Sequence, residues 1–224
     1  MIKLPAFGLI ILLAVSSCQP NQEMLFKAID PTQSKLDFSN NRWFEPDFNI
    51  FRYRNYYNGG GVGLIDFNQD GLLDIYLVAN MDTNRLYQNL GNFEFQDVTH
   101  TAGVQGSHKW STGVTVVDVN ADGWPDIYLC NSGDISGDDR KNELFINNGD
   151  GTFSEQAQSY GLADSGYSIH SSFFDYDKDG DLDMYLVNNS YKAIGSFDLT
   201  INQRHLRDSI GGDKLFKNEN GQFI

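Results

Sequence analysis

The alternation of hydrophobic and polar positions predicts a chain built mainly of short β-strands. Runs of three to five residues rich in branched and aromatic side chains recur without the three-to-four-residue spacing of an amphipathic helix. They flank three polar stretches, preceding them at 63–65, 114–117 and 172–174 and following them at 75–78, 127–130 and 184–187. Each polar stretch is therefore expected to connect two antiparallel strands as a hairpin.

The polar stretches are three copies of one nine-residue loop, at 66–74, 118–126 and 175–183. Two further strand patterns follow each copy, separated by Gly and Asn residues typical of hairpin turns. Four strands in roughly 50 residues are the pattern of a β-propeller blade. The sequence therefore predicts an all-β fold, a β-propeller of four-stranded antiparallel blades, with about three blades at 59–104, 105–163 and 164–224.

The repeat count predicts an incomplete ring. A propeller closes with typically 4–8 blades, whereas about three are visible, and Ile224 falls inside the expected last strand. We therefore expect a fragment of a larger propeller, in which a strand at Leu25–Ile29 pairs with a blade beyond residue 224. If the chain ends at residue 224, the blades must associate with other copies to cover their faces.

Residues 19–58 precede the repeats and are expected to hold this N-terminal strand and an aromatic segment. Seven aromatic residues lie close together there: Trp43, Phe44, Phe48, Phe51, Tyr53, Tyr56 and Tyr57. Because large rings are usually buried, a hydrophobic plug on the end of the sheets is favoured over a ligand-binding patch.

Each loop has the ligand spacing of a calcium site. Oxygen-bearing side chains stand at loop positions 1, 3, 5 and 9, glycine stands at position 6, and the backbone carbonyl at position 7 would add a ligand. Calcium takes roughly 6–8 oxygen ligands, and short side chains at alternate positions can turn inward around one ion. The candidate metal ligands, for about three Ca²⁺ ions, are Asp66, Asn68, Asp70, Leu72 and Asp74, then Asp118, Asn120, Asp122, Trp124 and Asp126, then Asp175, Asp177, Asp179, Asp181 and Asp183.

The surroundings of the loops exclude an EF-hand. That motif needs a bidentate Glu at position 12 and flanking helices, but position 12 is Leu77, Leu129 and Leu186 and the flanks are strand-like. An acidic turn without an ion is the remaining alternative. It is disfavoured because carboxylates crowded into one hairpin repel each other unless a cation lies among them.

The first 18 residues have the pattern of an export signal. Lys3 precedes an apolar run, Leu4–Val15, which is too short to span a bilayer and which ends in small residues before Cys18. This segment resembles a bacterial lipoprotein signal, with Cys18 as the lipidation site; an ordinary secretory signal with a chance Cys is the alternative. Gln19 after the Cys favours the outer membrane by the same resemblance. We therefore expect an exported lipoprotein, at the outer membrane or cell surface and held to the membrane only by its lipid.

The net charge and the placing of the Cys and His residues exclude some classes of partner and activity. A net charge of −14 argues against nucleic acid as a partner, and eleven of the 30 carboxylates lie in the three loops. Cys130 has no second mature Cys to pair with and is expected in the core. None of the four His residues has a zinc-type spacing or lies beside a Ser nucleophile elbow. No catalytic residues are therefore assigned, and a module that binds a protein or glycan is favoured over the propeller part of a polysaccharide-degrading enzyme.

The repeated pattern Asp-x-Asn/Asp-x-Asp-Gly-x-x-Asp, with the Gly-rich entry at 59–63, resembles FG-GAP/VCBS repeats over about residues 21–224. Those repeats are the calcium-bearing blades of integrin α-chain propellers and of many bacterial surface proteins. The segments 85–89, 95–99 and 102–104 look like the bacterial lipoprotein subgroup that carries an ASPIC/UnbV (cartilage acidic protein-like) domain. The resemblance implies a surface binding or scaffold module whose calcium is structural.

Overall fold

A computed structural model describes residues 25–107, 110–133, 139–190 and 206–224. The predicted signal segment and its Cys18 lie outside the described residues, so both stay predictions. In the part of the chain that is described, no helix has the length and apolar character needed to cross a membrane.

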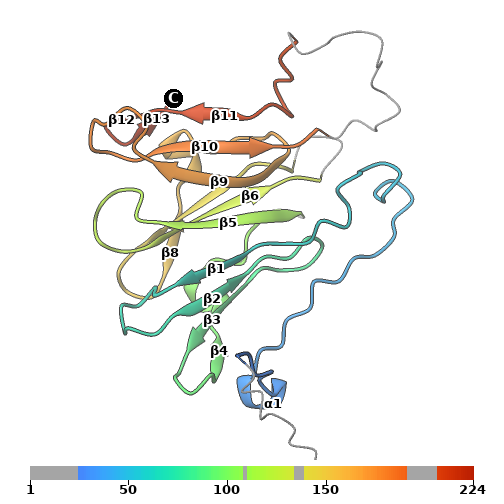
Figure 1. Cartoon of the computed structure of the whole chain (residues 1–224), viewed down its shortest axis with the longest axis vertical. Coiled ribbons are helices and arrows are strands. Elements are labelled where there is room, and N and C mark those ends of the chain that lie inside the picture. Colours follow the sequence, from blue (N-terminus) through green and yellow to red (C-terminus); the bar gives the residue numbers. More distant parts are fainter. Residues whose placement is uncertain (1–24, 108–109, 134–138, 191–205) are drawn as a thin grey trace, which may run out of the picture.

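Two four-stranded antiparallel sheets confirm the predicted blades (Figure 1). The first sheet has the strand order of the sequence: β1 (Val62–Ile65), β2 (Asp74–Leu77), β3 (Arg85–Asn89) and β4 (Phe95–Asp97). The second repeats this order: β5 (Ser111–Val117), β6 (Asp126–Asn131), β7 (Glu143–Asn147) and β8 (Phe153–Glu155). The strands before and after each nine-residue loop pair with each other, as a hairpin connection requires. We refer to these sheets as blades 1 and 2.

Blade 3 is divided between a three-stranded sheet and a short hairpin. The sheet contains β9 (Ser168–Phe174), β10 (Asp183–Asn188) and β11 (Lys214–Phe216), and the hairpin contains β12 (Asn218–Glu219) and β13 (Gln222–Phe223). Backbone hydrogen bonds of 3.0 and 2.9 Å between Lys217 and Ile224 continue the pairing. The hairpin thus supplies the fourth strand of blade 3, and the fold is a partial β-propeller.

The helices found in the described residues are single turns: α1 (Pro31–Ser34), α2 (Thr99–Ala102) and α3 (Ala157–Tyr160). Helices α2 and α3 begin the connections to the following blades. Both end at a glycine with positive φ, Gly103 at 76° and Gly161 at 78°, a conformation that glycine adopts without strain.

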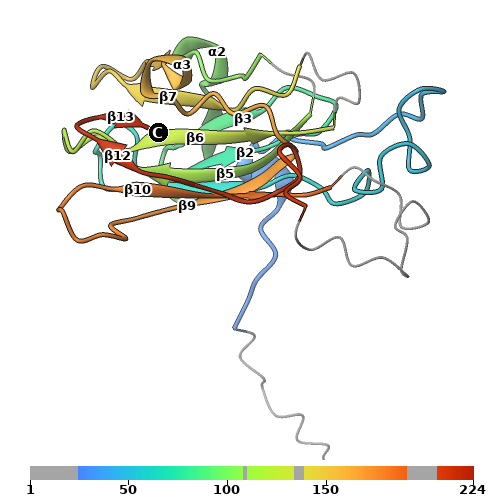
Figure 2. The same ribbon diagram turned by 90° about the horizontal axis from the view of Figure 1, so that it is seen from above.

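The core lies between the blades, because each blade is too thin to bury apolar side chains alone. One cluster of buried side chains joins blades 1 and 2, and a second joins blades 2 and 3. Strands β6 and β7 are buried along their whole length, since blade 2 lies between blades 1 and 3 (Figure 1), which overlap it when the molecule is seen from above (Figure 2). The innermost strands approach closely: a Cβ on Gly113 would lie 2.2 Å from the carbonyl oxygen of Ile169, so only glycine fits there.

The expectations for the N-terminal segment are met in part. Tyr53, Tyr56 and the partly buried Phe48 pack against Trp110 and Tyr167, which confirms a buried aromatic plug. The remaining rings of the segment, Trp43, Phe44, Phe51 and Tyr57, are exposed. The described residues form no strand at Leu25–Ile29, and Leu25 is 94% exposed; the pairing of this segment with a blade beyond residue 224 stays a prediction. An extended segment needs a partner edge for its backbone groups, and no described strand pairs with it.

Candidate functional site

The three candidate calcium loops lie at one edge of the blades. Each loop connects the innermost strand of a blade to the second strand, and the three turns lie on the same side of the molecule (left in Figure 1). Neighbouring loops also touch, since the Gln69 side-chain amide donates a 2.8 Å hydrogen bond to the carbonyl of Gly123. The repeat therefore builds a row of equivalent loops.

The loops share one backbone conformation. Positions 4 and 6 have positive φ in every copy: Gln69 and Gly71, Ala121 and Gly123, Lys178 and Gly180, with values from 57° to 99°. A Cβ on the position-6 glycines would meet no atom within 4 Å. Glycine is therefore required there by backbone conformation rather than by lack of space.

In the first two loops the side-chain oxygens are oriented by the loop's own backbone. The carboxylate of Asp66 accepts hydrogen bonds of 3.0 Å from the N–H groups of Asp70 and Gly71. Asp118 accepts the equivalent bonds from Asp122 and Gly123 at 3.1 and 2.8 Å. The position-1 carboxylate thus closes the turn without a bound ion, so the loop is preorganised for binding one.

The position-9 carboxylates, Asp74, Asp126 and Asp183, are fully buried. Asp126 is typical: it accepts the N–H of Val119 at 3.0 Å and that of Asn147 at 2.8 Å. Burial nevertheless raises the pKa of Asp74 and of Asp126 to about 6, and the neighbouring loop carboxylates add to the increase. Ionisation of these two carboxylates is therefore less favourable than ionisation of a solvent-exposed Asp, and a bound cation would compensate for this.

Three asparagines that were not assigned from the sequence fasten the loops to the outer strands: Asn89, Asn147 and Asn218. Each donates its backbone N–H to the buried carboxylate of its own blade, at 2.7–2.9 Å. Each also donates its amide to the carbonyl that precedes that carboxylate and accepts the N–H of a turn glycine. Their common place at the end of the third strand pattern in every copy was the signal that could have identified them.

The third loop comes nearest to a metal site. Asp175, Asp177 and Asp183 each place a carboxylate oxygen so that the three oxygens lie within 4.8 Å of one another, which no other group of acidic, His or Cys residues in the described ranges does. One side-chain oxygen of Asp181 is buried without a hydrogen-bond partner. The other two loops do not bring their carboxylates this close. All these donors are oxygen atoms, which fits a hard cation such as Ca²⁺.

A lysine lies beside the third loop. The Lys217 ammonium is 3.1 Å from Asp177 and 2.8 Å from Glu219. The hydrogen bonds to Glu219 and Asp177 raise the pKa of Lys217, and the hydrogen bond from Lys217 lowers the pKa of Asp177. Lys217 thus supplies a positive charge next to a candidate calcium ligand.

Replacing Lys217 with Gln is expected to tighten calcium binding at the third loop. Gln88 holds the equivalent place in blade 1, one residue before the asparagine that fastens the loop. Removing a positive charge that would repel a bound Ca²⁺ and that pairs with its candidate ligand Asp177 should raise the calcium affinity roughly three- to tenfold at low salt, as measured by isothermal titration calorimetry. Lys35→Gln, which breaks the ion pair with Glu94 on blade 1, is the control. An unchanged or weaker affinity of Lys217→Gln would contradict the assignment.

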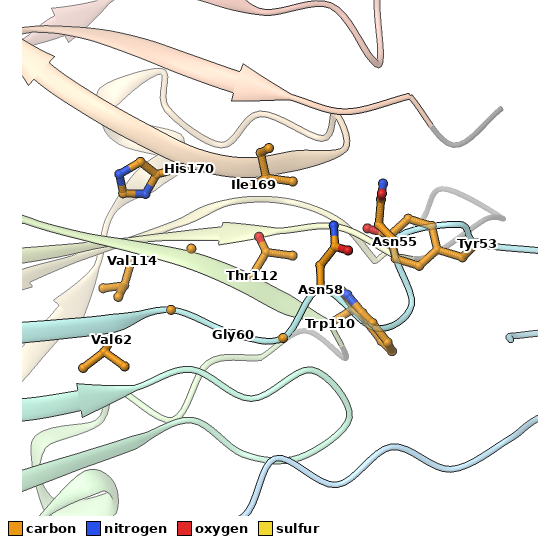
Figure 3. A pocket seen from close by; sticks show the side chains of 13 residues that line it. Tyr53, Asn55, Asn58, Gly60, Val62, Trp110, Thr112, Val114, Ile169 and His170 are labelled. Atoms are coloured by element: carbon orange, nitrogen blue, oxygen red, sulfur yellow. The ribbon is translucent and has the colours of Figure 1, made fainter. Parts of the chain in front are cut away.

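A pocket of about 370 Å³ lies at the opposite ends of the innermost strands, where β1, β5 and β9 begin (Figure 3). Tyr53, Asn55 and Asn58 contribute to it from the N-terminal segment, and Thr112 and His170 from the strands. The described residues that line it include no carboxylate. The pocket therefore offers amide, hydroxyl and imidazole groups, and it lies apart from the calcium loops.

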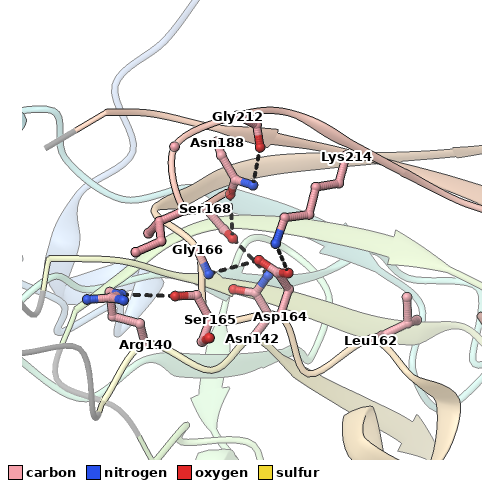
Figure 4. A network of polar contacts seen from close by, with 12 residues as sticks. Arg140, Asn142, Leu162, Asp164, Ser165, Gly166, Ser168, Asn188, Gly212 and Lys214 are labelled. Atoms are coloured by element: carbon pink, nitrogen blue, oxygen red, sulfur yellow. Dashed lines mark hydrogen bonds and ion pairs between the residues drawn. The ribbon is translucent and has the colours of Figure 1, made fainter. Parts of the chain in front are cut away.

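Other ionisable side chains of the described residues lie in the core or in contacts between blades. Cys130 is fully buried on β6 and burial raises the pKa of its thiol, as expected for a core residue. Between blades 2 and 3, Lys214 forms an ion pair with Asp164, and Asn142 donates to Ser168 at 2.9 Å (Figure 4). This polar network holds the connection between the two blades.

A comparison with protein-family models also finds a repeat at the positions of the loops. The chain matches the family model described as "FG-GAP-like repeat" at residues 66–129 and 133–186, more than half of its length. The first match contains the first two loops and the second match contains the third. A search of curated proteins found no match.

Proposed function

Because the chain belongs to the family of FG-GAP-like repeat proteins, we propose that it is a calcium-binding β-propeller module that binds a protein or glycan, with calcium in a structural role. The observation that carries this proposal is the row of three equivalent loops at one edge of the blades. Each loop has a buried carboxylate at position 9 and a fastening asparagine on the third strand.

The donor chemistry supports calcium. The side-chain ligands assigned in each loop are carboxylates and, in the first two loops, an amide oxygen; they include neither thiolate nor imidazole. Such oxygen sets suit Ca²⁺, and extracellular modules bind it with Kd values of roughly 10⁻⁴–10⁻³ M. Ions in the loops would neutralise crowded carboxylates and join each inner hairpin to its outer strands.

The separation of loops and pocket supports a structural role for the ions. The loops lie at one end of the innermost strands, and the pocket lies at the other end. A ligand in the pocket would not touch a loop ion. A carboxylate that holds calcium is also poorly placed to act as a general acid, so we assign no catalytic residue to the loops.

Calcium stoichiometry tests the proposal. Equilibrium dialysis should give about three ions per chain for the wild type and two for Asp70→Ala, because Asp70 serves only the first loop. Gln96→Ala, an exposed change on β4 of the same blade, should keep three. If Asp70→Ala binds as many ions as the wild type, the first loop is not a calcium site.

A polysaccharide panel tests the binding function. We expect any glycan that binds to be recovered intact. New reducing ends or unsaturated uronate absorbance would instead show the polysaccharide-degrading enzyme that is the alternative.

We further propose that the chain is an exported lipoprotein of the ASPIC/UnbV subgroup, attached through Cys18 at the outer membrane or cell surface. The apolar run that ends at Cys18 supports this. Labelled palmitate should enter the wild-type protein and not Cys18→Ala. Equal labelling of both proteins would contradict lipidation at this residue.

A further inference from the structure

The pocket at the beginning of the innermost strands contains a buried amide group without a partner. Asn55 lines this pocket and is only 8% exposed. Its amide nitrogen makes no hydrogen bond with any residue that the structure describes, and the neighbouring Tyr53 hydroxyl pairs with Ser132 at 3.0 Å instead. A buried N–H group without an acceptor is costly. A ligand that brings an acceptor into the pocket would remove this cost.

The other polar side chains of the pocket supply both donors and acceptors. Asn58 is exposed and His170 is half-buried, and both line the pocket. The Thr112 hydroxyl donates to the carbonyls of Cys130 and Ser168 at 3.0 and 2.8 Å, so its oxygen is left to accept. Groups of this kind suit a ligand hydroxyl, which donates one hydrogen bond and accepts others.

The pocket has a polar end and a more apolar end. Figure 3 shows Asn55 and Asn58 toward the end near Tyr53, whereas Val62 and Val114 lie toward the other end. Small-molecule sites commonly combine apolar walls with a few placed polar groups. A sugar ring has the same division, because hydroxyl groups surround its edge and C–H groups cover its faces.

The lining favours an uncharged ligand. The residues described around the pocket include no Asp, Glu, Lys or Arg, so a charged group on the ligand would find no partner of opposite charge there. The net charge of −14 also repels anions at longer range. A neutral sugar fits these conditions better than an acidic one.

The backbone beside the pocket is poorly suited to an extended peptide. The N–H of Gly61 donates to the carbonyl of Thr112 at 2.7 Å, and the hydroxyl of Thr115 donates to the carbonyl of Ser171 at 2.8 Å. These bonds link the innermost strands of neighbouring blades. Because a peptide that adds to a sheet needs a row of free backbone groups, recognition by side chains is favoured.

We propose that this pocket binds one neutral sugar residue of a glycan. Asn55 donates to a sugar oxygen, and Asn58, Thr112 and His170 bond the hydroxyl groups. The volume of about 370 Å³ lies within the range of small-molecule sites. This inference rests on the proposed binding function and names its ligand class and residues. Every group involved comes from blades 1–3 or the segment before them, so the site needs no residue of a further blade.

Nuclear magnetic resonance of the full chain, expressed without acylation, tests the site. Methyl glycosides of glucose, galactose, mannose and N-acetylglucosamine are titrated into the protein in millimolar calcium. The side-chain amide signal of Asn55, identified by its absence in Asn55→Ala, should shift saturably with at least one of them. The inference is overturned if none of these sugars shifts it. A shift caused only by glucuronate, or only by a capped serine-containing tripeptide, would overturn it as well.

Variants of the lining residues test which groups bind. Asn55→Ala and His170→Ala should each weaken sugar binding roughly tenfold, as measured by saturation-transfer difference spectra of the sugar. His100→Ala, at an exposed position on α2 outside the pocket, is the matched control and should bind like the wild type. Asn55→Ala should melt at the same or a higher temperature, because its amide nitrogen loses no partner. A lower melting temperature would show a structural role for Asn55 instead.

Calcium stoichiometry of the same samples separates this inference from the proposed function. About three ions per chain, together with sugar binding that both variants leave unchanged, would overturn the pocket assignment while the calcium-dependent module remains. A chain that binds no calcium would contradict the proposed function, whatever the sugar titration shows.

Discussion

Chelating calcium is expected to lower the melting temperature of the protein by roughly 10 °C. An ion at ten times its Kd adds about 1.4 kcal/mol to the free energy of unfolding, so three loops would together contribute about 4 kcal/mol. For a chain of 224 residues, 1 kcal/mol corresponds to roughly 2–4 °C. The effect should be large because the loops fasten the inner hairpin of every blade to its outer strands.

The measurement is a pair of thermal melts by circular dichroism, one in millimolar calcium and one with excess chelator. Magnesium serves as the control, because it demands a smaller octahedral site and gives up its water reluctantly. We expect it to restore little of the lost stability. The same melting temperature with and without calcium would show that the loops hold no structural ion.

Asp126→Ala is expected to be the most destabilising of the loop substitutions considered. Asp126 lies in blade 2, is fully buried and accepts the N–H groups of Val119 and Asn147. Leaving two buried N–H groups without acceptors costs about 1–3 kcal/mol each. Removing a buried carboxylate whose pKa is raised to about 6 offsets part of this cost. We expect a net loss of about 2–3 kcal/mol in chelator and about 4 kcal/mol in calcium, where the ion is lost as well.

Asp122→Ala provides the matched control for this substitution. Asp122 is an exposed candidate ligand in the same loop, so its loss should remove the ion without leaving a buried group unpaired. Urea unfolding should therefore show Asp122→Ala equal to the wild type in chelator and about 1.4 kcal/mol weaker in calcium. If Asp126→Ala behaved in the same way, the buried hydrogen bonds would contribute nothing to stability.

The sequence alone determined the repeat, the strand type and the loops. Hairpins at 66–74 and 118–126 depend on residues close together in the chain, because strand pairing, turn glycines and alternate acidic side chains act over a few positions. These features are therefore visible without a structure, and the partial propeller follows from their threefold occurrence.

The tertiary structure decided which of these groups have partners. One of the two hydrogen bonds to Asp126 comes from Asn147, 21 residues away. The plug forms because Tyr53 packs against Trp110 and Tyr167. Tyr76, Tyr128 and Tyr185 look alike in sequence, yet two are buried and one is exposed. A local pattern reports what a residue can contact, whereas burial depends on whether another blade lies against it, and that is a property of the assembled fold.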